Sequence, residues 1–238
     1  MTALPKQKTL IYNTKLPSTQ ELIKFRPFLV KEEKALLIAQ QSEDTLVLVD
    51  TLKNIVKSCV VNKLDVNNLA MFDLEYLLLQ IRGKSVGEIV ELIFSCDECA
   101  DPKAKVAVSF DISKIEVVKD PTHSKTIPLF DDVGLVMKYP SIDIIKNFES
   151  LDMDNLESVF DLIIKSIDYI YSGDKLFHAK EQSTQELSEF VDNLTQEQFQ
   201  KLKVFYETMP RLRQDVSYTC PVCNKVHNKY LEGIETFF

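Results

Sequence analysis

The sequence predicts an α+β fold, and three patterns of apolar residues carry this prediction. Residues 9–30 contain two short apolar segments on either side of a turn-forming stretch, which is typical of a β-hairpin. Apolar residues recur at the spacing of one helical face in residues 45–60 and again in residues 156–171. Between these segments, residues 104–139 alternate between apolar and polar side chains, as half-buried strands do. The expected fold therefore combines an N-terminal β-hairpin, helical segments, a central antiparallel β region and a C-terminal hairpin.

The first 95 residues are expected to hold the hairpin and three helices. The hairpin pairs Leu10–Tyr12 with Leu22–Phe25, and Pro17 lies in the turn between them. The helices are predicted over residues 31–41, 45–60 and 69–85. Gly83 is expected to close the third helix, because glycine is common at helix C-termini.

The remaining chain is expected to contain strands and helices. A strand over 90–94 leads into Cys96, and a strand over 212–220 lies near the C-terminus. Helices are predicted over residues 141–149, 156–171, 183–194 and 195–210, the last two from capping boxes at their N-termini. These elements divide the chain into four segments, which together are expected to form one compact unit: residues 1–95, 96–140, 141–210 and 211–238.

Charge and composition exclude several classes of function. The chain has 238 residues, a formal net charge of −8 and five glycines. An acidic chain lacks the basic face that phosphate backbones require, so nucleic acid is not an expected partner. No apolar run reaches the roughly 18 residues of a membrane-spanning helix, and the segment MTALPKQKTLIYN lacks the apolar core of a signal peptide. We therefore expect an intracellular protein without membrane insertion, whose cysteines stay reduced.

Four of the five cysteines form two Cys-x-x-Cys pairs. Cys96 and Cys99 stand in CDEC, and Cys220 and Cys223 stand in CPVC. A Cys-x-x-Cys turn presents two sulfurs on one side, so two such turns predict a closed site of four cysteines for a structural zinc ion. The long spacer requires an inserted domain that returns the chain to a point beside its start. The second pair is then expected to lie in a C-terminal zinc-knuckle hairpin.

Other interpretations of the cysteines stay open at the level of the sequence. A redox dithiol needs one thiol with a lowered pKa, and usually a thioredoxin-like context. The pairs could also be incidental core cysteines, which is how we interpret Cys59 on the apolar face of a predicted helix. His227, four residues after Cys223, is a further potential ligand, although an exposed hairpin residue is the simpler interpretation.

The sequence contains no motif that indicates an enzyme. There is no phosphate-binding loop, no dinucleotide fingerprint and no serine nucleophile elbow. The histidines, His123, His178 and His227, stand in unrelated contexts. Carboxylate pairs such as Asp131–Asp132 and Glu32–Glu33 are expected to be solvated surface groups. We therefore expect neither catalytic nor cofactor-binding residues apart from the metal ligands.

Both ends of the chain resemble one protein family. The segment LPSTQELIKFRPFLVKEEKALLIA (16–39) is similar to the opening of a baseplate protein family of T-even-type, contractile-tailed bacteriophages. The CPVC knuckle and the ending LEGIETFF are similar to the end of that family, whereas the middle shares only the general layout. The resemblance implies a component of the central baseplate hub or an assembly factor (a chaperone) for the hub. It implies no catalytic residues.

The resemblance also implies other baseplate or hub proteins as partners, and it is compatible with an oligomer within the baseplate. The expected location is the host cytoplasm during assembly, or the virion tail. The candidate contact residues at the two ends of the chain are Phe25, Arg26, Pro27, Phe28, Phe237 and Phe238. The same side chains could instead close the chain's own core. Two rival functions stay open, a zinc-ribbon adaptor of transcription or replication machinery and a dithiol oxidoreductase.

Overall fold

The computed structural model describes residues 8–42, 44–99, 101–146 and 156–233. Helices and antiparallel sheets both occur, which confirms the predicted α+β class. The chain forms two compact units, each of which is described separately below. The first, here named the knuckle unit, comprises Met1–Val66, Phe72–Val118 and Arg211–Phe238. The second, the inserted unit, comprises Asn67–Met71 and Lys119–Pro210.

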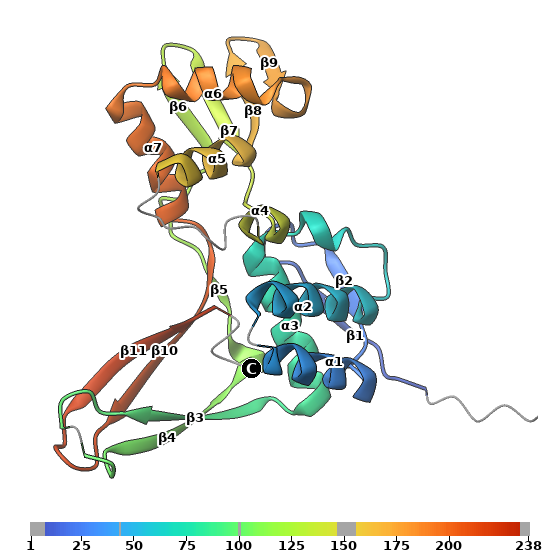
Figure 1. Ribbon diagram of the computed structural model, residues 1–238, viewed down its shortest axis with the longest axis vertical. Coiled ribbons are helices and arrows are strands. Elements are labelled where there is room, and N and C mark those ends of the chain that lie inside the picture. Colours follow the sequence, from blue (N-terminus) through green and yellow to red (C-terminus); the bar gives the residue numbers. More distant parts are fainter. Residues whose placement is uncertain (1–7, 43, 100, 147–155, 234–238) are drawn as a thin grey trace, which may run out of the picture. The chain divides into compact units, whose positions relative to one another are not determined.

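The knuckle unit begins with the predicted hairpin and three helices (Figure 1). These elements are β1 (Tyr12–Lys15), β2 (Leu22–Phe25), α1 (Val30–Gln41), α2 (Thr45–Cys59) and α3 (Met71–Val86). The hairpin is antiparallel and pairs Tyr12 with Phe25. Its first strand is Tyr12–Lys15 and not the predicted Leu10–Tyr12, so the bounds of that strand were wrong. The apolar face predicted for α2 is buried, and Cys59 lies on it with no exposed surface. The prediction of Cys59 as a small core residue is thus confirmed.

The end predicted for α3 was wrong. Gly83 lies inside the helix, where an added Cβ would meet other side chains only at ordinary contact distances of 3.6 Å and more. The helix continues to Val86, and the chain leaves the helical conformation at Gly87, whose φ is +135°. Only glycine adopts such an angle without steric cost, so Gly87 takes the role expected of Gly83.

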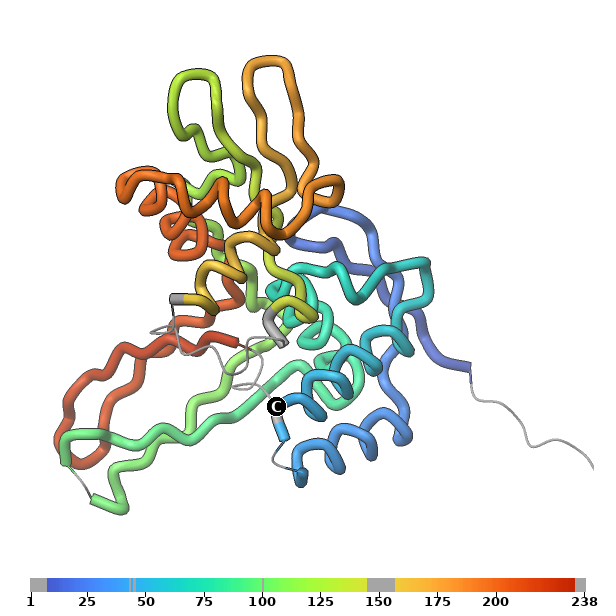
Figure 2. Tube along the Cα trace, turned by 45° about the horizontal axis from the view of Figure 1, so that its top comes forward, coloured from blue at the N-terminus to red at the C-terminus, as the bar shows by residue number. Residues whose placement is uncertain are grey.

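Two long hairpins complete the knuckle unit, and their tips meet in both views (Figures 1 and 2). The first pairs β3 (Ile89–Ser95) with β4 (Lys105–Asp111), and the second pairs β10 (Arg211–Thr219) with β11 (Val226–Glu232). A short strand, β5 (Val117–Val118), adds to the other edge of β10. Each hairpin alternates between exposed and buried residues. The inward faces share one apolar cluster, which includes Val90, Phe94, Leu212, Val216, Tyr218 and Leu231.

The inserted unit is a four-stranded antiparallel sheet with helices packed on one face. The strand order is β6 (Thr126–Phe130), β7 (Val133–Met137), β8 (Ile167–Ser172) and β9 (Lys175–His178). The helices that pack on the sheet are α5 (Leu156–Ser166), α6 (Thr184–Asp192) and α7 (Gln196–Glu207), and a short helix, α4 (Ile142–Lys146), precedes them in the chain. Leu135 and Ile170 of the sheet share a core with Ile163, Val191 and Leu202 of the helices. The predicted capping boxes at the N-termini of α6 and α7 are both present.

The helix predicted over 156–171 is only partly correct. It ends at Ser166, and the segment from Ile167 onwards is strand β8. The three-residue spacing of Ile167 and Ile170 fits a helical face, but the segment pairs with β7 and β9 as a strand. The pairing with β7 is irregular between Val136 and Met137, so both isoleucines can be buried. Gly173 has a φ of +55° in the turn between β8 and β9.

We predict opposite effects on stability for two glycine-to-alanine substitutions. At Gly134 in β7, a Cβ would lie 2.2 Å from the hydroxyl oxygen of Tyr171 and 2.6 Å from the carbonyl oxygen of Ile127. Gly134→Ala should therefore lower the free energy of unfolding by about 1–3 kcal/mol. Gly83→Ala is the matched control and should raise it by about 0.5–1 kcal/mol, because helical alanine has less backbone entropy to lose. Urea unfolding measures both, and equal effects would contradict the packing described at Gly134.

A second prediction concerns His123, a half-buried residue of the inserted unit. Its Nδ1 lies 2.9 Å from Thr208 Oγ1, and its Nε2 lies 3.1 Å from the hydroxyl of Tyr139. Burial lowers the pKa of His123 below the ordinary value of 6.5; nearby Lys125 lowers it further, and Asp120 raises it. The unfolded chain then binds more protons than the folded chain between the two pKa values. Stability from this residue is complete above pH 6.5 and is lost as the pH falls through the lowered pKa.

His123→Phe keeps an aromatic ring in place and removes the titrating group. We expect the free energy of unfolding of the natural chain to fall from about pH 7.5 to about pH 5.5, and to fall less in the variant. Chemical denaturation at both pH values measures the difference. An identical fall in both proteins would show that other groups cause the pH dependence.

Candidate metal centre

The two Cys-x-x-Cys turns lie at the tips of the two long hairpins. Cys96 follows β3, and Cys220 follows β10, as the sequence predicted. Each turn is closed in a similar way, because the first cysteine donates its backbone N–H across the hairpin. Cys96 bonds to the carbonyl oxygen of Ala104, and Cys220 bonds to that of Lys225, both at 2.9 Å. The two turns therefore present their sulfurs from equivalent backbone positions.

The sulfurs of both turns converge. All four Sγ atoms, those of Cys96, Cys99, Cys220 and Cys223, lie within 4.8 Å of one another. Cys96 and Cys223 approach to 3.9 Å, and Cys99 and Cys220 approach to 3.4 Å. These distances exceed the S–S bond of about 2.05 Å, and all four thiols are free. Tetrahedral zinc–sulfur bonds of about 2.3 Å place sulfur atoms about 3.8 Å apart, so the four residues fit a metal ion of this kind.

The polar surroundings of the sulfurs favour the thiolate at one position in each turn. Backbone N–H groups of Cys223 and Val222 point to Cys220 Sγ and lower the pKa of that thiol to about 7. The Val222 nitrogen lies 3.4 Å from this sulfur. A backbone N–H of Glu98 similarly lowers the pKa of Cys96. Thiolates are the form that binds metals, so the turns are suited to metal binding.

Side chains next to the cysteines join the two turns. Lys225 forms an ion pair with Glu98, and Lys229 forms one with Asp97 at 2.7 Å. The acidic residues belong to the CDEC turn, and the lysines follow the CPVC turn. All four side chains are exposed to solvent to a considerable degree, so each pair contributes little to stability by itself. Both pairs nevertheless join an acid of the first turn to a lysine that follows the second turn, and they therefore favour the arrangement in which the sulfurs meet.

His227 is half-buried rather than exposed, which corrects its interpretation as an exposed hairpin residue. Its Nε2 lies 3.3 Å from Cys96 Sγ, and its ring stacks on Tyr218 at 5.0 Å between centroids. Among the described residues, the group of mutually close ligand atoms contains the four cysteine sulfurs and not this nitrogen. His227 therefore lies beside the cluster and outside the set of four.

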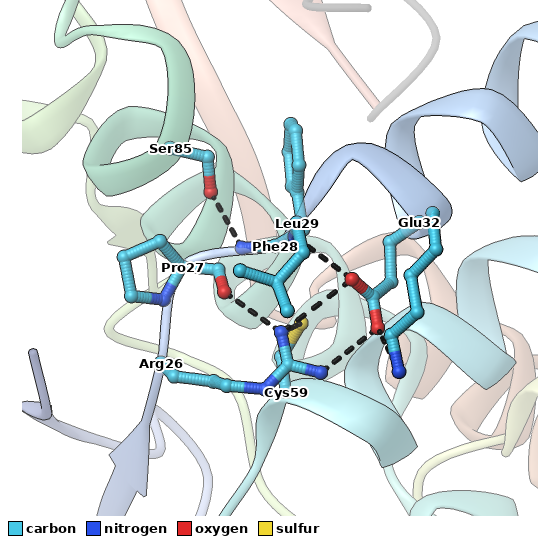
Figure 3. A network of polar contacts seen from close by, with 8 residues as sticks. Arg26, Pro27, Phe28, Leu29, Glu32, Cys59 and Ser85 are labelled. Carbon is cyan, nitrogen blue, oxygen red and sulfur yellow. Dashed lines mark hydrogen bonds and ion pairs between the residues drawn. The ribbon is translucent and has the colours of Figure 1, made fainter. Parts of the chain in front are cut away.

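The FRPF motif forms a separate polar network in the knuckle unit (Figure 3). The Arg26 guanidinium donates to the Glu32 carboxylate at 2.8 Å and to the Pro27 carbonyl oxygen at 2.9 Å. The Glu32 carboxylate also accepts the backbone N–H of Leu29 at the start of α1. Glu32 is only 6% exposed, so its interpretation as a solvated surface group was wrong. The ion pair with Arg26 lowers the pKa of Glu32 against the opposing effect of burial.

The candidate contact residues differ in how accessible they are. Phe25 is 1% exposed and belongs to the core, and Arg26 is engaged in the network described above. Pro27 and Phe28 are half-buried. The Phe28 ring lines a small pocket with apolar side chains of α1, α2 and α3, namely Leu36, Ile55, Leu78 and Ile81. Phe237 and Phe238 lie outside the described residues.

Sequence reasoning missed the contacts that surround the sulfurs and the FRPF motif. The signal for the ion pairs was present, since CDEC carries two acids and the segment CPVCNKVHNK carries two lysines. No local signal pairs Arg26 with Glu32, because charged residues are also common in exposed first turns of helices.

Comparisons with known proteins agree with the resemblance noted at the two ends of the chain. No curated protein and no solved structure matches it. Within the described residues, no helix is both long enough and apolar enough to span a membrane. The family described as T4 bacteriophage base plate protein matches residues 9–238, which is nearly the whole sequence and includes both cysteine turns. The chain therefore belongs to the family of T4 bacteriophage base plate proteins.

Proposed function

We propose that this baseplate protein is a non-enzymatic component or assembly factor of the central hub of a contractile tail, and that a structural zinc ion stabilises it. The family membership supports a structural role in the baseplate. The observation that carries the metal proposal is the convergence of four thiols from two distant turns. The protein would act in the host cytoplasm during assembly and, if it stays in the particle, in the virion tail.

Zinc is the metal that suits this donor set best. Four thiolates are soft ligands, and a tetrahedral arrangement of sulfurs is typical of zinc and of iron–sulfur sites in proteins. The complete set of four leaves no coordination position for a substrate, so the ion would be structural and not catalytic. When bound, it would join residues 96–99 to residues 220–223 and thereby fasten the tips of the two hairpins.

Partner contacts are proposed at the two ends of the chain. Phe28 lines a small pocket, and both Pro27 and Phe28 are partly accessible, which supports their contact with another hub protein. Phe25 and Arg26 would contribute by holding this segment in position, because both are engaged inside the unit. Phe237 and Phe238 are proposed as the second contact, since two terminal phenylalanines are apolar groups that a partner can bury.

Metal content tests the zinc proposal. We expect about one zinc ion per chain in protein purified without added metal, as measured by elemental mass spectrometry. Cys99→Ser should remove most of this zinc and lower the thermal stability of the protein, because binding free energy of a structural metal is also folding free energy. Cys59→Ser is the matched control. It replaces a buried cysteine outside the cluster and should leave the zinc content unchanged.

Three results would contradict the zinc proposal. The first is a metal-free natural chain with a single fast-reacting thiol, which would instead support the dithiol oxidoreductase. The second is equal zinc content in Cys99→Ser and Cys59→Ser. The third is a site that carries iron in place of zinc, which the same analysis would detect.

Binding measurements test the proposed contacts. Phe28→Ala should reduce the affinity for the hub proteins of the same phage by about tenfold or more, as loss of a buried aromatic anchor commonly does. Deletion of Phe237 and Phe238 should have an effect of similar size. Tyr230→Ala is the control, because Tyr230 is an aromatic residue that is 58% exposed on β11. Co-expression, purification and titration by calorimetry measure the affinities.

The same experiment separates partner contact from a role in the chain's own core. If the deletion unfolds the chain, the terminal phenylalanines close its core. If all variants fold and bind as the natural chain does, the proposed contacts are incorrect. Purification with RNA polymerase or replication proteins in place of hub proteins would favour the zinc-ribbon adaptor.

A further inference from the structure

We propose that His227 is a positioning residue of the metal centre and donates its Nε2–H to the thiolate of Cys96. This inference rests on the proposed zinc function and extends it to a group outside the four ligands. The distance between His227 Nε2 and Cys96 Sγ is 3.3 Å, which is suitable for an N–H···S hydrogen bond. The residues come from opposite hairpins, so the bond would join the two turns independently of the metal.

The orientation of the His227 ring is fixed by its neighbours. In the register between β10 and β11, His227 lies directly opposite Tyr218. The two rings are nearly parallel, with an interplanar angle of 17°. The Tyr218 hydroxyl donates at 3.0 Å to the carbonyl oxygen of Ser95, the residue before Cys96. The same tyrosine therefore positions the imidazole and holds the strand end that carries Cys96.

The arrangement favours a donor and not a fifth ligand. Four thiolates complete a tetrahedral site, and His227 lies outside the group of sulfurs within 4.8 Å of one another. A zinc ion with four thiolates carries a net charge of about −2. Cys96 is only 7% exposed, so water has little access to its share of this charge. Hydrogen bonds from the protein must therefore stabilise it.

The other polar groups near Cys96 do not replace a side-chain hydrogen-bond donor to its sulfur. The backbone N–H groups of Glu98 and Cys99 point to its sulfur. The nearby cations, Lys225 and Lys229, form ion pairs with Glu98 and Asp97. His227, on β11 of the opposite hairpin, brings a ring nitrogen to 3.3 Å from Cys96 Sγ, whereas the sulfur of Cys223 lies 3.9 Å away and is itself a proposed ligand. Donation lowers the electron density on the thiolate, which slows its protonation and the loss of the metal.

Three variants of the full chain test the proposal. His227→Phe keeps a ring that can stack on Tyr218 but has no N–H. His227→Gln restores a donor of similar reach without the ring. His178→Phe is the matched control, since His178 also packs against a tyrosine, Tyr169, but belongs to the inserted unit. The readouts are zinc transfer to a colorimetric chelator and the sulfur-to-metal charge-transfer band of Co²⁺-substituted protein.

We expect His227→Phe to bind one zinc ion but to lose it about ten times faster than the natural chain. Its cobalt charge-transfer band should shift to lower energy, because a thiolate without the hydrogen bond gives up an electron more easily. His227→Gln should recover part of both properties, and His178→Phe should match the natural chain. Equal rates and equal bands in all four proteins would overturn the role of His227 while leaving the zinc centre in place.

Nitrogen NMR of the zinc-loaded natural chain gives a test that needs no variant. The proposal requires a proton on His227 Nε2, which the ¹⁵N chemical shifts of the ring report. An unprotonated Nε2 would overturn the proposal even if His227→Phe failed to fold. A natural chain that binds neither zinc nor cobalt would remove the metal centre itself, and this inference with it. The two failures are therefore distinguishable.

Discussion

The architecture of the knuckle unit depends on one constraint, namely that two turns far apart in the sequence must meet at their sulfurs. The hairpins that carry these turns each bury one face, and an isolated two-stranded hairpin is marginally stable in water. Their shared apolar cluster, which includes Phe94 and Tyr218, fixes how the two faces pack. The sulfur cluster lies at their tips, which the proposed metal ion would fasten. Either contact alone would leave one end of the paired hairpins unsupported.

The long spacer between the turns is compatible with this constraint. Closure entropy grows only with the logarithm of loop length, so a large insertion costs little more than a short one. Most of the spacer, Lys119–Pro210, belongs to a unit with its own core. The inserted unit thus has an apolar core that shares no residue with the apolar cluster of the hairpins. A covalent or metal-mediated link is most useful in such a chain, because it joins segments that local folding alone cannot bring together.

The sequence predicts the elements whose pattern has a single interpretation. Helices α6 and α7 begin at Ser183 and Thr195, where capping boxes are visible in the sequence. The first hairpin and the strands before the cysteines were also predicted. The segment from Ile167 was misassigned because its apolar spacing suits a helix, and the irregular pairing that makes it fit a strand is not visible in the sequence. Strand β9 was missed because Lys175–His178 is short and mostly exposed. In both cases tertiary pairing decides the conformation, and a local pattern cannot show it.

The candidate site also has a part that the sequence predicts, the sulfur cluster, and a part that it does not, the contacts of the FRPF motif. Cysteine spacing predicts that the sulfurs meet, because a structural metal site of this type needs only four thiols as ligands.

The FRPF motif looks like a contact surface in the sequence, yet Phe25 is buried and Arg26 binds Glu32 at a mostly buried site. A buried ion pair adds little net stability, but removing one partner leaves an uncompensated charge. Such a pair fixes geometry more than it adds energy. In this chain it holds the segment that presents Phe28, whose backbone N–H also bonds to Ser85 of α3. The first two residues of the motif therefore hold its last two in position. The partner contact proposed for Phe28 would then depend on the ion pair between Arg26 and Glu32, even if the partner does not touch that pair.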